Sequence, residues 1–83
     1  MRTKRPALLE YFVLLNAGKW QVLLGAQLLS DHDTYREAYR AVEAETTRAA
    51  QRGQRSKIVV GPVDGVRVEF PVLEPTNQPL GRA

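Results

Sequence analysis

Hydrophobic and polar positions are most clearly patterned between residues 34 and 53, where the apolar positions recur at helical spacing. At about 100° per residue they fall within a stripe roughly 100° wide, which is typical of a helix packed on another layer. Thr34 followed by Glu37 is a capping-box pattern for the start of this helix. Gly53 is a typical residue just past a helix end. The pattern predicts one amphipathic helix with a buried stripe of Tyr35, Ala38, Tyr39, Val42, Thr46 and Ala49.

The segment ahead of this helix predicts a β-hairpin. Residues 11–15 are aromatic and branched, which favours a strand. Residues 16–19 have the composition of a turn, and residues 20–24 read as a second strand. Side chains of a strand point alternately to its two faces, so three residues of this second strand share one face: Trp20, Val22 and Leu24.

Two segments leave alternatives open. Residues 7–10 fit either a helical turn or part of the first strand. Residues 25–33 fit either a short third strand that carries Leu28 and Leu29 or a loop packed under the helix.

The segment after the helix predicts a second pair of strands. Residues 57–60 form an apolar branched run, and residues 66–70 alternate strictly between apolar and charged side chains. Residues 61–65 between them contain Asp-Gly, a strong turn signal. Pro71 either ends the last strand or places it at a sheet edge.

These elements predict an α+β fold with the order ββαββ. We expect a two-layer sandwich in which one helix packs on a small antiparallel sheet. Residues 1–6 are expected to be a flexible basic arm, residues 7–73 a single domain, and residues 74–83 a disordered Pro-rich tail.

Short motifs in this order resemble a family of small bacterial domains of unknown function. That family reads Y-x-V, G-W-x-V, T-x-x-E-A, I-x-x-H and D-G-x-I, and the resemblance covers about residues 11–69. The chain departs from the pattern at Gly61, where the family often has histidine. The resemblance implies the same fold and no assigned activity. The matching residues are Tyr11, Val13, Gly18, Trp20, Val22, Thr34, Glu37, Ala38, Ile58, Asp64, Gly65 and Val66.

The W-x-V strand and the T-x-x-E-A helix are also similar to those of the arm-binding domains of phage integrases. In that family a small sheet enters the major groove of DNA. This chain has additional strands after the helix, and its sheet side chains are a poor match for phosphate contact, being Gln21, Leu23, Arg67 and Glu69.

Composition limits the class of protein. At 83 residues the chain is one domain with a marginal core, and without cysteine it has no disulfide or thiolate metal site. Twelve Lys and Arg against nine Asp and Glu give a net charge of +3, a mild excess. No apolar run approaches the roughly 18 residues of a membrane span. The start, M-R-T-K-R-P, imitates a signal peptide, but Glu10 interrupts the apolar stretch, so we expect a cytoplasmic protein.

The residues that could carry catalysis are few. His32 is the only histidine and lies between Asp31 and Asp33, where a base or a metal ligand is conceivable. Ser30 and Ser56, the only serines, lack the sequence context of a catalytic nucleophile. We expect the two aspartates to serve the turn and the helix start, and His32 to be solvated. The sequence therefore predicts no catalytic residue, no metal site and no cofactor.

Basic residues form one candidate site. No acidic residue lies between Thr46 and Lys57, so the helix end and the following strand are locally cationic. Together with the arm they make a candidate contact for an anion or a nucleic acid, although such cations also complement a helix dipole. The candidate residues are Arg2, Lys4, Arg5, Arg48, Arg52, Arg55 and Lys57.

Adjacent leucine pairs form the other candidate site. Neighbouring residues of a strand point to opposite faces, and one helix covers only one face. At least one leucine of several pairs is therefore expected to face outward, and large exposed apolar patches mark interfaces. The candidates for self-association are Leu23, Leu28 and Leu29.

The sequence thus favours a small non-enzymatic binding module of bacterial or phage origin. We expect it to be a homodimer or higher homo-oligomer, with a further protein as a conceivable partner and no membrane contact. The alternative is a nucleic-acid-binding accessory protein that uses the basic arm and helix end, with weak affinity.

Overall fold

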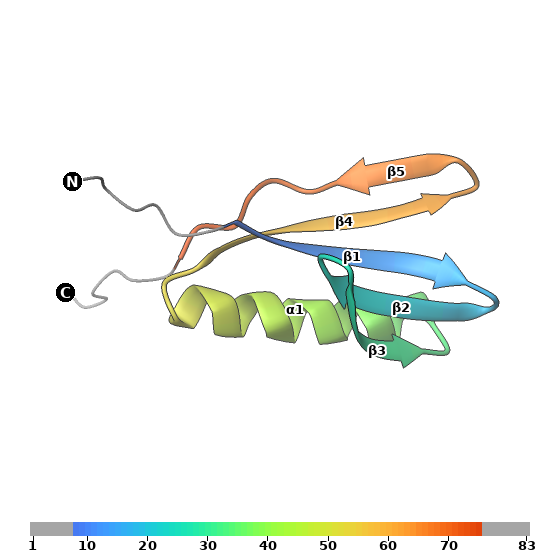
Figure 1. The fold of residues 1–83 in the computed structure, drawn as a ribbon, viewed down its shortest axis with the longest axis horizontal. Coiled ribbons are helices and arrows are strands. Elements are labelled where there is room, and N and C mark those ends of the chain that lie inside the picture. The colour runs from blue at the N-terminus through green and yellow to red at the C-terminus, as the bar shows by residue number, and fades with distance from the viewer. Residues whose placement is uncertain (1–7, 76–83) are drawn as a thin grey trace.

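The computed structural model describes residues 8–75 as one helix lying against one face of a five-stranded sheet (Figure 1). The order of strands in the sheet is β3-β2-β1-β4-β5, so β1 is central. Neighbouring strands run antiparallel, except that β1 and β4 are parallel. The elements are β1 (Leu8–Asn16), β2 (Lys19–Leu24), β3 (Gln27–His32), α1 (Tyr35–Gln51), β4 (Arg55–Val63) and β5 (Val66–Glu69).

The structure confirms the α+β class and the single helix on a sheet, and it differs from the prediction in two respects. Residues 25–33 contain a third strand, β3, so the order is βββαββ. The sheet is mixed and not wholly antiparallel, because α1 carries the chain from the end of β3 back to the end where β3 began. β4 therefore runs in the same direction as β3 and β1, and it joins the sheet beside β1.

The ends of α1 follow the predicted signals. Thr34 has an extended backbone, and its Oγ1 accepts a hydrogen bond from the N–H of Glu37 at 3.2 Å. At the other end Gly53 has φ +78°, a left-handed conformation that glycine adopts without strain. The N–H of Gly53 donates to the carbonyl of Ala50, and the N–H of Gln54 donates to that of Ala49, as in a Schellman motif.

The core lies between α1 and the face of the sheet that it covers. Trp20, Val22 and Leu24 share this face, as predicted, and Trp20 packs edge-on against Tyr35. Residues 8–10 belong to β1, so the helical-turn alternative is wrong. The fully buried members of the core are Tyr11, Val13, Val22, Ala38, Val42 and Ile58.

The first strand of the second pair, β4, is longer than the predicted residues 57–60. Gly61 and Pro62 belong to β4, and the turn contains only Asp64 and Gly65. Pro62 is tolerated because the pairing with β5 is irregular between Val60 and Val63, where no ladder N–H is required. β5 ends before Pro71 at the sheet edge, as predicted.

Beyond β5 the chain returns to the start of β4. Leu73 exchanges backbone hydrogen bonds with Ser56, at 2.7 and 3.1 Å. The predicted arm, residues 1–6, and residues 76–83 of the predicted tail lie outside the described residues.

Candidate binding surface

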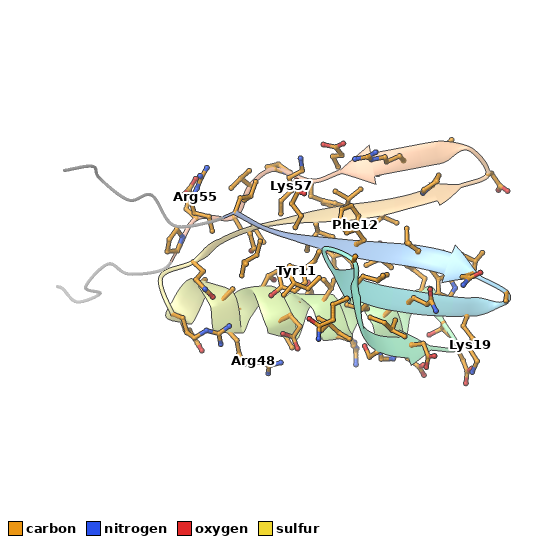
Figure 2. The ribbon with its side chains drawn as sticks, viewed as in Figure 1. Tyr11, Phe12, Lys19, Arg48, Arg55 and Lys57 are labelled. Carbon is orange, nitrogen blue, oxygen red and sulfur yellow. The ribbon has the colours of Figure 1, made fainter. Side chains whose placement is uncertain are left out.

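The sheet face away from α1, hereafter the open face, carries a continuous apolar row. In-register partners on neighbouring strands share a face. Leu28 pairs with Leu23, Leu23 with Phe12, and Phe12 with Val59. The row therefore crosses four strands, β3, β2, β1 and β4, and it meets Glu69 on β5. In Figure 2, Phe12 lies on the opposite side of β1 from Tyr11, which points to the helix.

The side chains of this apolar row become more exposed from its β4 end to its β3 end. Val59 is 2% exposed although it lies outside the cluster under the helix, so its neighbours on the open face cover it. Phe12 and Leu23 are half-buried, and Leu28 at the edge is 50% exposed. Among residues 8–75 the only helix lies on the opposite face. An apolar strip of this kind is typical of an interface.

The three predicted self-association residues differ in position. Leu23 and Leu28 lie opposite each other on the open face; two-residue alternation along β2 places Leu23 there, and the register shift between β2 and β3 places Leu28 there. Leu29 is 37% exposed and lies where the pairing of β2 and β3 is irregular. Phe12 and Val59 also lie on this face and were not predicted from the sequence, although alternation with Tyr11 and Val13 could have placed Phe12 there.

A charged corner, defined as Lys57, Arg67 and Glu69, borders the apolar row on β4 and β5. Glu69 accepts from Lys57 Nζ at 2.9 Å and from Arg67 at 3.0 Å. The hydrogen bond and charge of Lys57, with the charge of Arg67, hold the pKa of Glu69 below its usual range. One carboxylate between two cations leaves the corner with one net positive charge.

The opposite edge of the open face is acidic. Asp31 on β3 pairs in register with Gln21, and Gln21 pairs with Leu14. Asp31 is exposed and forms no ion pair with another residue of the described chain. The open face is therefore apolar along the row from Leu28 to Val59, negative at the β3 edge and positive at the β5 edge, with Glu10 of β1 in register beside Lys57.

Those members of the predicted basic cluster that the structure describes do not form one patch. Lys57 belongs to the open face beside β5, whereas Arg48 projects from α1 on the other side of the molecule (Figure 2). Arg48 pairs with Glu45 at 2.7 Å and Arg55 with Glu74 at 3.4 Å. These carboxylates compete with any phosphate for their cations.

The remaining members of the predicted basic cluster lie at the end of α1 or outside the described residues. Arg52 is the C-cap residue of α1 and is exposed. Arg2, Lys4 and Arg5 lie outside the described residues.

His32 does not occupy a solvated helix start, so that part of the prediction is wrong. It ends β3 opposite Trp20 and is half-buried, because β3 extends through Asp31 before the chain turns into α1. Its Nε2 lies 2.9 Å from the Oγ of Ser30, two residues away on the same strand face. Ser56 is fully buried on β4, and within the described chain its Oγ has no hydrogen-bond partner.

Residues 8–75 contain no cluster of three or more His, Cys, Asp or Glu side chains arranged to bind a metal ion. Within the same residues no helix has both the length and the apolar character needed to cross a bilayer.

Comparison of the chain with protein-family models, curated proteins and solved structures finds no significant match. The resemblance to small bacterial domains therefore stays a prediction.

Proposed function

We propose that this protein is a small non-enzymatic binding module of bacterial or phage origin that self-associates through its open face. The observation that supports this most directly is the apolar row from Leu28 to Val59, which crosses four of the five strands on the face away from α1. A chain of 83 residues has a marginal core, so covering this row would add stability.

Two-fold pairing is the commonest way to cover such a row, because the same patch then serves both partners. The chain is free of cysteine, which suits a reducing compartment, and we place the module in the cytoplasm. The ion pairs of Arg48, Arg55 and Lys57 make the nucleic-acid alternative the weaker of the two.

Sedimentation equilibrium at micromolar concentration tests the proposal. We expect the wild-type protein to be a dimer or larger and Leu28→Lys to shift it toward the 9.3 kDa monomer. Leu28 is the most exposed member of the row, so a lysine there should leave the fold intact.

The matched control is Leu15→Lys. Leu15 is 44% exposed, but it lies on the helix side of β1, opposite Trp20. It should leave the association constant unchanged. A wild-type protein that is monomeric at every concentration would refute the proposal.

A further inference from the structure

The open face has a geometry that limits how a second copy can bind. β1 is the central strand, with two strands on each side, so the acidic β3 edge and the basic β5 edge are equally far from it. Two strand spacings correspond to about 10 Å.

Asp31 and Arg67 also lie at similar heights along the strands. Asp31 is level with Gln21 and Leu14. Val13 is level with Val60, and Val60 with Val68. One residue further along each strand, Leu14 and Arg67 are therefore close to the same level.

We propose that two copies pack face to face about a two-fold axis parallel to β1. This inference rests on the self-association proposed above. This axis places β3 of one copy over β5 of the other. Asp31 of each copy then meets the partner copy's Arg67, and the two apolar rows lie over each other in opposite directions. The occupant of the open face is thus a second copy of this chain, recognised by its complementary edge charges.

The other in-plane axis, perpendicular to the strands, gives a poorer match. It would place β3 over the partner copy's β3 and bring the two Asp31 carboxylates toward each other. It would also oppose the two positively charged corners. Like charges in an interface disfavour that arrangement and select the axis parallel to β1.

The proposed contact is also sterically reasonable. Packed sheets lie about 10 Å apart. An extended arginine and an aspartate that point toward each other span about this distance. In the single chain, Arg67 forms an ion pair with Glu69, and Glu69 also forms one with Lys57. Because one carboxylate neutralises only one of these two cations, the charged corner keeps one positive charge for the partner copy.

Charge reversal tests this arrangement. Asp31→Lys and Arg67→Glu each turn both edge contacts repulsive in a homodimer. We expect each variant alone to dimerise about tenfold more weakly, a change of ~1.4 kcal/mol. An equimolar mixture of the two should recover most of this loss, because the heterodimer is attractive at both edges: one keeps the native Asp31–Arg67 contact, and the other pairs the introduced lysine with the introduced glutamate. Glu43→Lys, an equal charge change on the exposed side of α1, is the control and should have no effect.

Cysteine cross-linking gives a test that does not depend on charge. The chain has no native cysteine, so Asp31→Cys and Arg67→Cys each introduce a single thiol. In a mixture of the two variants, a bifunctional thiol-reactive cross-linker of about 10 Å should join the two different variants faster than two identical ones. Such a heterodimer retains one native Asp31–Arg67 contact.

The outcomes separate the two proposals. A wild-type dimer that is insensitive to both charge reversals and that links identical variants fastest would refute the axis and leave the open-face interface standing. A wild-type monomer would refute both.

Discussion

The ring of Trp20 packs edge-on against that of Tyr35, with centroids 5.2 Å apart and planes inclined by 64°. This contact ties β2 to the first turn of α1. Tyr35 also lies 5.8 Å from Tyr39, which lies 6.1 Å from Phe70. A row of aromatic rings thus links one side of the core to the segment after β5.

Tyr35→Ala should therefore expose Trp20. Aromatic pairs contribute about 0.5–1.5 kcal/mol beyond the area they bury, so the free energy of unfolding should fall by at least that amount. Trp20 is the only tryptophan, so its emission should shift to the red. Tyr35→Phe keeps the ring and should behave like the wild type. An unchanged emission spectrum in Tyr35→Ala would show that this contact does not shield Trp20 in solution.

Thr34→Ala should destabilise the protein by about 0.5–2 kcal/mol, because the N–H of Glu37 would lose its acceptor at the helix start. Urea unfolding followed by circular dichroism measures the change. Thr34→Asn supplies another capping acceptor and should retain most of the stability. If the midpoint of the alanine variant equals that of the wild type, the cap does not stabilise α1.

Stability should depend on pH through Asp33. Lys19 donates to Asp33 Oδ1, and this hydrogen bond together with the lysine charge lowers the pKa of the carboxyl. A carboxyl whose pKa is depressed in the folded state stabilises it above the unfolded value of about 3.9. That contribution is lost as the pH falls through the folded value.

Asp33→Asn removes this contribution. The stability difference between wild type and Asp33→Asn should be constant near neutral pH and should shrink below about pH 4. Urea midpoints measured from pH 7 to pH 2 give the comparison. Molar salt should also reduce the difference, since both side chains are exposed. A difference that does not vary with pH would rule out the ion pair as its cause.

Any affinity for nucleic acid should be electrostatic and weak, roughly 10⁻⁴–10⁻⁶ M at physiological salt. Anisotropy of a labelled duplex should show binding that falls steeply between about 50 and 200 mM salt. Arg48→Gln should change it little, because Arg48 pairs with Glu45. Sequence-selective binding that survives physiological salt would contradict this and favour the nucleic-acid alternative.

The sequence by itself determined where α1 and the first hairpin lie and which face most of their side chains occupy. The start of α1 at Thr34 and the turn at Asp64 and Gly65 depend on hydrogen bonds and backbone angles within a few residues. The placement of Trp20 under the helix and of Leu23 away from it follows from the two-residue repeat of a strand.

Only the tertiary structure decided how these elements meet. β3 forms because Gln27–His32 can pair with β2, although its own pattern is as compatible with a loop. β4 lies parallel to β1 because α1 returns the chain to the end where β3 began. The apolar row and the charged corner join residues up to 57 positions apart, from Phe12 to Glu69. Such long-range register depends on which strand edges are free when the sheet assembles, and no local pattern encodes that.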